Sequence, residues 1–262
     1  MPRELDDVAT TIDAQRERDA QLGEVDDSLI RRILVPYKLI RSYCRVTVEG
    51  LDRLPVGRAI LAANHTGWLG LDYANLAVTI HDGIGRIVRG VVHEAWFANK
   101  KIGDVAKRLG LVPASIDSMV ALLKQGRLVV IFPEGEHGAF KAVTEETKYK
   151  LFEFRRGFVR AAMAAKAPIV PVAIVGGEEA NPSLATLKLT DRLFRLPLPV
   201  PQNVLPYPVK WRISFLDPIP MSKYRAKDIT NKPLVHKIAA DVQGLIQDEL
   251  EVQLKKRGNK YL

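Results

Sequence analysis

Residues 58–72 read Arg-Ala-Ile-Leu-Ala-Ala-Asn-His-Thr-Gly-Trp-Leu-Gly-Leu-Asp, and the rest of the chain is organised around them. The apolar run within them, residues 59–63, predicts a short buried strand that ends at Asn64 and His65. A histidine at a strand end, followed by a carboxylate such as Asp72, is typical of a general base with its orienting partner.

The spacing of His65 and Asp72 limits how the two side chains can meet. If residues 65–72 formed one helix, the pair would share a face but lie roughly 10 Å apart along the axis. The pair therefore requires a loop, which Gly67 and Gly70 permit because glycine adopts backbone conformations that other residues avoid. The alternative from these residues alone is a solvent-facing histidine, with Asp72 serving only as the N-cap of the next helix.

The length and composition of the chain are those of an ordinary globular protein. The 262 residues, 47% hydrophobic and 26% charged, fit one large domain or two small ones. The single cysteine, Cys44, excludes an internal disulfide, fits a reducing compartment and is expected to be a buried structural thiol. No apolar run reaches the roughly 18–20 residues of a transmembrane helix, and residues 1–27 contain no secretory signal. We therefore expect a cytoplasmic protein without a transmembrane helix.

The net charge of +9 and the pI near 9.6 point to an anionic partner. Nucleic acid, anionic lipid and acidic cofactors all qualify on charge alone. The sequence has no zinc-ligand spacing, RNA-binding aromatic signature or helix-turn-helix pattern, so we expect no nucleic acid. Its histidines are scattered without metal-ligand spacing, so we expect no metal.

Strand-like and helix-like segments alternate along the chain, which predicts an α/β fold with one mixed, mostly parallel sheet and helices on both faces. The predicted strands are residues 44–48, 59–63, 87–92, 128–132, 168–175 and 210–215. The predicted helices are residues 73–80, 94–109, 115–124, 157–165 and 232–254. In the last helix we expect one buried face made of Val235, Ile238, Val242, Leu245, Ile246 and Leu250.

Two segments, residues 1–44 and 196–208, differ in character from the rest of the chain. We divide the chain into an N-terminal helical extension, residues 1–44, and one domain, residues 45–262. Within the extension, residues 28–43 form a basic amphipathic segment that Pro36 would kink or divide. Such a segment either lies on a membrane surface or packs on the core with its basic residues in solvent. Prolines crowd residues 196–208, which we expect to form an apolar loop.

Three short blocks follow one another in the chain: Asn64-His65 with Asp72, then Phe132-Pro133-Glu134-Gly135, then Pro168-Ile169-Val170-Pro171-Val172. In this order and spacing, the chain resembles the glycerolipid and lysophospholipid acyltransferase superfamily. The resemblance covers roughly residues 45–220, and the segment 110–115 stands where the family has its second block. It implies a glycerol-phosphate acyltransferase-like α/β domain.

The resemblance also implies a mechanism and a set of site residues. His65 would be the general base that deprotonates the acceptor hydroxyl, and Asp72 would hold the imidazole. The hydroxyl would attack an acyl thioester of coenzyme A or acyl carrier protein, with no covalent enzyme intermediate and no cofactor. The acceptor would be a glycerolipid or lysophospholipid in lipid synthesis or remodelling. The substrate-binding residues would be Asn64, Glu134, Gly135 and Pro171.

The chain departs from the family's pattern where an acceptor phosphate would bind. Six residues separate the histidine from the aspartate, two more than usual, as in a branch related to acylglycerol acyltransferases. Ile116 and His137 stand near positions where the family usually offers arginine. Since neither replaces a bidentate arginine–phosphate contact, we expect glycerol 3-phosphate to be a poor acceptor. Lysophosphatidic acid is one alternative if Lys141, Arg155 or Arg156 supplies the charge, and a neutral glyceride is the other.

A lipid substrate places the protein at a membrane. We expect peripheral association on the cytoplasmic side, with residues 28–43 and 196–208 facing the lipid. Trp68, Trp96 and Phe97 either line an acyl groove or pack in the core. A different class of function is a catalytically silent lipid-binding or scaffold protein on the same fold, although such a protein has no need of the histidine, aspartate and glutamate set.

Overall fold

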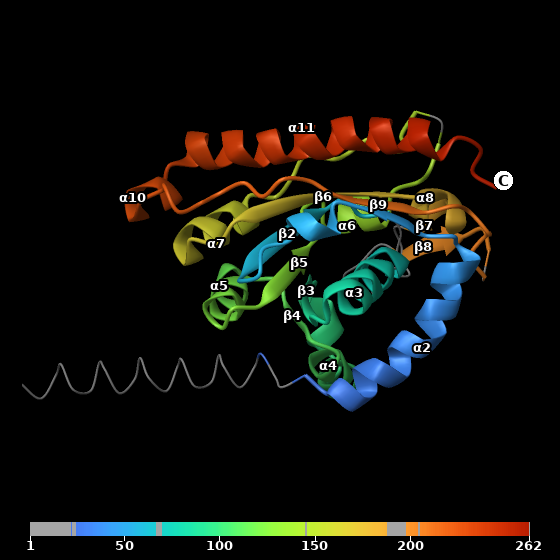
Figure 1. Ribbon diagram of the computed structural model, residues 1–262, viewed down its shortest axis with the longest axis horizontal. Helices are drawn as coiled ribbons and strands as arrows, with labels where there is room; N and C mark the ends of the chain where they lie inside the picture. The colour runs from blue at the N-terminus through green and yellow to red at the C-terminus, as the bar shows by residue number, and fades with distance from the viewer. Residues whose placement is uncertain are drawn as a thin grey trace, which may run out of the picture.

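The computed structural model describes residues 22, 25–66, 70–144, 146–187, 198–203 and 205–261. Within these residues, seven strands form one sheet of order β1-β9-β6-β2-β5-β3-β4 (Figure 1). Neighbouring strands are parallel except β6 and β9, so β1 and β9 run against the other five. The strands are β1 Thr47–Glu49, β2 Ala59–Ala63, β3 Val88–Val92, β4 Leu111–Pro113, β5 Leu128–Ile131, β6 Ile169–Val175 and β9 Arg212–Phe215. This sheet confirms the predicted fold class.

Strand β2 lies in the middle of the sheet, between β5 and β6, and every one of its residues is buried. Its side chains alternate between two core clusters: Ile60 packs on one face of the sheet and Leu61 on the other. A strand buried on both faces needs the unbroken apolar run that the sequence provides. The carboxyl end of β2 therefore reaches the middle of the sheet edge where ligands bind in open parallel sheets.

Helices cover both faces of the sheet, as predicted. The core cluster on one face includes side chains of α5 Ile116–Lys124, α7 Gly157–Ala165 and α11 Lys232–Arg257. On the other face α3 Leu71–Ile84 packs on the sheet, and α2 Asp27–Tyr43 packs on α3. Figure 1 shows α11 along one side of the sheet, with α3 and α2 on the other. The remaining helices are η1 Leu51–Arg53, η2 Glu94–Phe97, α4 Lys100–Arg108, α6 Glu136–Ala139, α8 Gly177–Ala180 and α10 Ala226–Ile229.

The single helix predicted over residues 94–109 is wrong, because the structure has two helices there. The short helix η2 ends at Phe97, and α4 begins at Lys100. Asn99 separates them as the N-cap of α4: its side-chain oxygen accepts the backbone N–H groups of Lys101 and Ile102. An asparagine that caps a helix this way cannot also continue the preceding one.

The loop predicted over residues 196–208 is also wrong in part. Residues Leu198–Pro201 form β8, which pairs antiparallel with β7, Ser183–Leu187. Proline lacks the N–H that a central strand needs, but a two-stranded hairpin has two edges and tolerates it. Residues 196, 197 and 204 lie outside the described part of the chain.

Helix α2 is continuous through Pro36, so the proline does not divide it. Its Ile30 and Leu34 pack against Val78 of α3, which confirms core packing for this side of the helix. The helix ends at Tyr43, and its C-cap residue Cys44 is fully buried, as expected of a structural thiol. Among the described residues, no helix combines the length and the apolar character that crossing a membrane requires.

The C-terminal helix α11 packs on the core with the predicted face, except at one position. Leu245 is 43% exposed, whereas Val235, Val242 and Ile246 are fully buried. The face that meets the sheet is therefore narrower than the apolar pattern indicates.

Candidate active site

His65 and Asp72 meet beyond the carboxyl end of β2. The distance from His65 Nδ1 to Asp72 Oδ2 is 2.6 Å. Residues 64–66 leave the strand without forming a helix, and Gly70 begins α3 with a left-handed backbone, φ 66°. The N-cap of α3 is thus Gly70, and Asp72 lies in its first turn. The alternative in which the aspartate is only an N-cap is therefore wrong.

The Asp72 carboxylate is held by the backbone as well as by the imidazole. Its Oδ2 accepts the backbone N–H of Thr66 at 2.9 Å, and its Oδ1 accepts that of Tyr73 at 2.7 Å. The carboxylate is fully buried and accepts hydrogen bonds only, so the proton of the neutral imidazole lies on Nδ1. The other ring nitrogen of His65, Nε2, then carries the lone pair that a general base needs.

The surroundings of His65 favour its charged form. Burial lowers the pKa of the imidazole, but the charge and hydrogen bond of Asp72 outweigh burial, and Glu134 adds to them, so the pKa lies above the usual 6.5. The ring also stacks on Phe132, with ring centroids 4.4 Å apart. The His65 side chain remains 18% exposed, so it is held firmly but still accessible.

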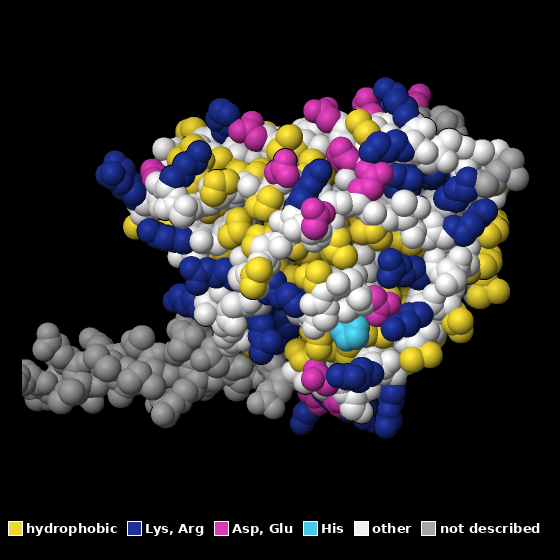
Figure 2. Space-filling view, viewed as in Figure 1, with side chains coloured by type: hydrophobic (Ala, Val, Ile, Leu, Met, Phe, Trp, Pro, Cys, Tyr) yellow, Lys and Arg dark blue, Asp and Glu magenta, His cyan; other side chains and the backbone are white. Residues whose placement is uncertain are grey.

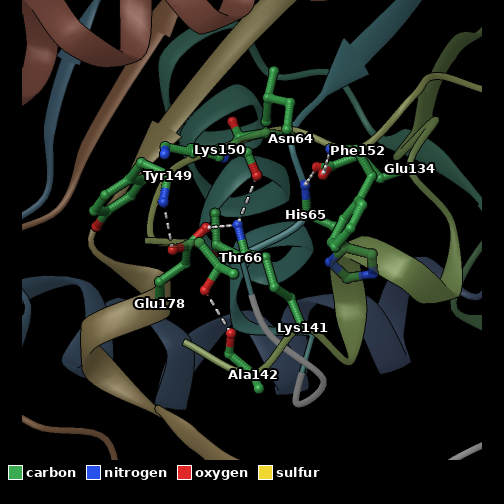
Figure 3. Close-up of polar contacts among 12 residues, drawn as sticks. Asn64, His65, Thr66, Glu134, Lys141, Ala142, Tyr149, Lys150, Phe152 and Glu178 are labelled. Atoms are coloured by element: carbon green, nitrogen blue, oxygen red, sulfur yellow. Dashed lines mark hydrogen bonds and ion pairs between the residues drawn. The ribbon is translucent and has the colours of Figure 1, made fainter. Parts of the chain in front are cut away.

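Glu134 holds the backbone of His65 through a hydrogen bond (Figure 3). Its Oε1 accepts the backbone N–H of His65 at 3.0 Å, and its Oε2 accepts that of Phe152 at 2.9 Å. The residue is 1% exposed, and burial raises the pKa of its carboxyl despite these bonds. Glu134 thus joins the end of β2 to the segment that precedes α7. Contact between Glu134 and the acceptor stays a prediction.

The other predicted substrate-binding residues lie in the framework around His65. The Asn64 amide donates to the Ile174 carbonyl at 2.9 Å and accepts the Ile174 N–H at 2.7 Å, which extends the pairing of β2 with β6. Gly135 has φ 61° and is the N-cap of α6. Pro171 is buried within β6, opposite Ala62. Their substrate-binding roles stay predictions.

Gly138 is a site residue that the sequence reasoning missed. A Cβ at this position would lie 2.7 Å from Glu134 Cβ and 3.0 Å from His65 Cβ. Only glycine lets α6 approach His65 and Glu134 this closely. The feature of the sequence that could have identified Gly138 is its position three residues after the Pro133-Glu134-Gly135 turn.

A buried ion pair next to the site was also missed. Lys141 Nζ lies 2.6 Å from Glu178 Oε1 and donates to the Lys150 carbonyl at 3.0 Å (Figure 3). The second oxygen of Glu178 accepts the Tyr149 N–H at 2.8 Å. Both charged side chains are 3% exposed. The sequence signal was Gly176-Gly177-Glu178-Glu179, which places two carboxylates directly after a buried strand.

The arginines that were candidates for binding a phosphate are both paired with carboxylates. Arg155 forms an ion pair with Glu136, and its guanidinium lies against Gly135. Arg156 pairs with Glu153 at 2.8 Å. Together with the buried Lys141, every cation proposed for an acceptor phosphate has a carboxylate partner.

Of the three aromatic residues proposed for an acyl groove, the structure describes Trp96 and Phe97. Trp96 is 49% exposed on η2, which follows the carboxyl end of β3, and Phe97 packs near Gly103 of α4. Trp68 lies outside the described residues. In the part of the chain that the structure describes, no group of three or more histidine, cysteine, aspartate or glutamate side chains could hold a metal ion.

Comparisons with known proteins identify the family. The Acyltransferase family matches residues 45–175, which contain His65, Asp72 and Glu134. An uncharacterized protein of Mycobacterium tuberculosis is 36% identical over 248 residues, covering 90% of this chain and 68% of that protein. A mouse protein named "DGAT1/2-independent enzyme synthesizing storage lipids" is 28% identical over 200 residues, covering 76% of this chain and 59% of its own length.

The fold has a solved counterpart as well. The crystal structure of the 1-acyl-sn-glycerophosphate (LPA) acyltransferase PlsC from Thermotoga maritima superposes with a TM-score of 0.57. The match covers 87% of this chain and 81% of that one, at 18% identity, and so shows the fold alone. With the family match over half of its length, the chain belongs to the acyltransferase family and has the PlsC-like fold.

Proposed function

We propose that this protein transfers a fatty acyl group from an acyl thioester to a hydroxyl group of a glycerolipid or lysophospholipid. The observation that carries the proposal is the His65–Asp72 pair at the carboxyl end of β2, with Nε2 of His65 unblocked by Asp72. Family membership supports the reaction class. The donor would be acyl-coenzyme A or acyl carrier protein, and the reaction would need no cofactor.

The reaction needs one base and one orienting carboxylate. His65 Nε2 takes the proton of the acceptor hydroxyl as its oxygen attacks the thioester carbonyl. The resulting tetrahedral intermediate expels the thiolate, which takes the proton back from the imidazolium. The products are an ester and a free thiol. The buried Asp72 holds the imidazole in the reactive tautomer and stabilises its charged form.

A neutral glyceride is the acceptor that the surroundings favour. Arg155 and Arg156 are already neutralised by Glu136 and Glu153, and Lys141 is buried against Glu178. A phosphorylated acceptor would have to displace one of these carboxylates before it gained a guanidinium partner. The name of the mouse relative, which refers to storage lipids, supports the same choice. We therefore place monoacylglycerol and diacylglycerol ahead of lysophosphatidic acid.

Thiol release from acyl-coenzyme A by the protein in detergent tests the reaction. Acceptors would be monoacylglycerol, diacylglycerol, lysophosphatidic acid and glycerol 3-phosphate, with products identified by mass spectrometry. We expect release that depends on a neutral acceptor and is lost in His65→Ala. The control is His236→Ala, since this histidine lies on the exposed side of α11. If no acceptor gives release with either type of donor, the silent lipid-binding alternative replaces the proposal.

Glu136→Gln tests the acceptor preference separately. The substitution frees Arg155 without changing the shape of the site, so we expect the ratio of lysophosphatidic acid to diacylglycerol turnover to rise several-fold. Asp241→Asn, which frees Lys237 on the exposed side of α11, is the control and should leave the ratio unchanged. A wild-type preference for phosphorylated acceptors would overturn the neutral-acceptor assignment but leave the acyl-transfer chemistry standing.

A further inference from the structure

Residues 149–155, which we call the strap, connect α6 to α7 and form neither a helix nor a strand. The side chains of Tyr149 and Phe154 are buried, so the strap runs partly inside the molecule. Backbone N–H and C=O groups that leave water need hydrogen-bond partners, and an irregular segment has no ladder to provide them. In the strap most of these partners are side chains from distant parts of the chain.

Two glutamines of α11 bind the backbone of the strap. The Gln247 side chain accepts the Leu151 N–H at 3.1 Å and donates to the Tyr149 carbonyl at 2.9 Å. One turn earlier in the helix, Gln243 accepts the Phe154 N–H at 3.1 Å. Residues four apart lie on the same side of a helix, so the two amides meet the strap together.

The same segment of the strap is bound to the active site from its other side. Glu134 accepts the Phe152 N–H with one oxygen and the His65 N–H with the other, as Figure 3 shows. Phe152 follows Leu151 directly, so Gln247 and Glu134 hold consecutive N–H groups. A continuous set of hydrogen bonds thus leads from α11 through the strap and Glu134 to the backbone of His65.

Packing of α11 does not explain the two glutamines. The outer side of the helix is charged: Figure 2 shows side chains of both signs along the upper edge of the molecule, where Figure 1 places α11. Val242 and Ile246 form part of the inner side and are fully buried. Gln243 and Gln247 follow these residues directly and are partly buried. Burying an amide costs free energy unless it is hydrogen-bonded, and here the bonds go to the strap.

We propose that Gln243 and Gln247 are positioning residues for the reaction at His65. They fix the strap, the strap fixes Glu134, and Glu134 fixes the backbone of His65. The inference rests on the proposed function, in which Nε2 of His65 has to lie within hydrogen-bond reach of the acceptor hydroxyl. A misplacement of about 1 Å can cost about 100-fold in rate, so contacts far from the reacting atoms affect catalysis.

Steady-state kinetics with a substitution that removes the amides tests this role. For Gln243→Leu with Gln247→Leu, we expect kcat to fall about tenfold or more and KM to change less than about twofold, since no substrate contact is lost. Gln243→Glu keeps an acceptor oxygen for the Phe154 N–H and should retain most of kcat.

Gln253→Leu is the matched control on the same helix. Gln253 is fully buried, and its side chain bonds to Arg212 and Glu49 but to no residue of the strap. Its loss should lower the free energy of unfolding and leave kcat unchanged. An equal fall of kcat in Gln253→Leu and in the Gln243/Gln247 variant would overturn the proposal, because any weakening of α11 would then have the same effect.

A mutant cycle with Glu134→Gln shows whether the glutamines act through Glu134. If they do, adding the two leucine substitutions to Glu134→Gln should slow the reaction little further, because the connection to His65 is already weakened. If the two losses of kcat multiply instead, the glutamines act independently of Glu134 and the proposal is wrong.

Amide hydrogen exchange tests the same connection without any reaction. In the Gln243/Gln247 variant, exchange should become faster at the Phe152 and His65 amides, and Gln253→Leu should not change it selectively there. Unchanged exchange at the His65 amide would overturn the positioning role. If the wild type releases no thiol with any acceptor, the proposed function fails, while exchange still decides whether α11 holds the backbone of His65.

Discussion

In the proposed reaction, His65 uses Nε2, because Asp72 occupies Nδ1. The acceptor proton would move to Nε2, and that nitrogen is available only while the imidazole is neutral. Asp72 raises the pKa of the imidazole above 6.5. Activity should therefore rise with pH through this raised pKa. The stability that the pair contributes has the opposite pH dependence: it is fully present below pH 6.5 and is lost as pH rises through the folded pKa.

Asp72→Asn should both slow the reaction and move its pH profile. The amide cannot stabilise the imidazolium and can hold the wrong tautomer, so we expect kcat to fall by about 10²–10⁴-fold. Without the carboxylate charge, the rising limb of kcat/KM should shift to lower pH. Rates measured across the pH range on one acceptor check this. An unchanged rising limb in the variant would mean that another group titrates.

Gly138→Ala should impair catalysis without touching the substrate directly. The added methyl group would meet Glu134 and His65 at 3.0 Å or less, so α6 or His65 has to move. We expect at least a tenfold loss of kcat with a small change in KM. Gly244→Ala is the control, because a Cβ there meets no atom within 4 Å. Equal kinetics for both variants would contradict the positioning role.

The sequence was most informative where chemistry depends on nearby residues. His65 and Asp72 are seven positions apart, so spacing and two glycines permitted their contact, and the family resemblance favoured it over the N-cap alternative. Glu134 and Asn64 were identified as site residues, but their bonding partners were not. Those partners are the backbones of Phe152 and Ile174, and only the folded sheet brings them into reach.

At the scale of elements, a second buried ion pair holds the end of α11 to α8. Arg257 forms a bidentate contact with Glu179, which also accepts the Tyr149 hydroxyl at 2.6 Å and pairs with Lys148 at 3.0 Å. The Tyr149 hydroxyl in turn accepts the N–H of Gly176 at 2.7 Å. The long C-terminal helix is thus fixed to the loop that follows β6, beside the Lys141–Glu178 pair.

Arg257→Gln should destabilise the whole protein in a pH-dependent way. Burial raises the pKa of Glu179, but its bonds to Arg257 and Tyr149 outweigh burial and lower it to about 2. The stabilisation is therefore present above pH 4.5 and is lost as pH falls towards 2. Breaking a buried pair costs about 3–5 kcal/mol, so urea unfolding at neutral pH should show a loss of that size.

The difference between wild type and Arg257→Gln should shrink below pH 4.5. Lys237→Gln is the control, because its pair with Asp241 lies on the exposed side of α11, where solvent screens the two charges and the pair contributes little to stability. A loss that stays constant at every pH would point to lost packing around the guanidinium instead of lost charge pairing.

Elements were predictable in proportion to their burial. Strands β2, β5 and β6 are central and apolar, and each lies within its predicted range give or take a residue. The three-residue strand β4 is too short to show a period, and the hairpin strand β8 is hidden by its prolines. The break before α4 depends on a capping bond of Asn99, which periodicity does not detect.

At the scale of the molecule, α2 contacts the domain that the sequence separates from it. The boundary at residue 44 stays a prediction, but Ile30 and Leu34 share a core cluster with Val78 of α3. Asp26, the N-cap of α2, also pairs with Arg108 of α4 at 2.7 Å. These contacts favour one cooperative unit.

Leu34→Ala tests that cooperativity. Loss of a buried leucine should cost about 2–5 kcal/mol, and in a single unit the loss lowers the melting temperature of every part alike. The melting temperature measured by circular dichroism, which follows the helices, should shift together with the one at which the buried Trp211 becomes exposed to solvent. The control is Leu39→Ala on the exposed side of the same helix. Separate transitions for the two probes would show that α2 unfolds independently.

The burial of Cys44 makes this protein convenient to assay. It is the only cysteine in the chain, it is fully buried, and burial raises the pKa of its thiol to about 11 despite the nearby Arg45. Thiol-detecting dyes react with thiolates, so the folded protein should give almost no background colour. Coenzyme A released in a single turnover could then be counted at high enzyme concentration. Because Cys44 is buried, a cysteine that replaces the exposed Leu39 of α2 would be the only accessible thiol, and an environment-sensitive fluorophore would attach there.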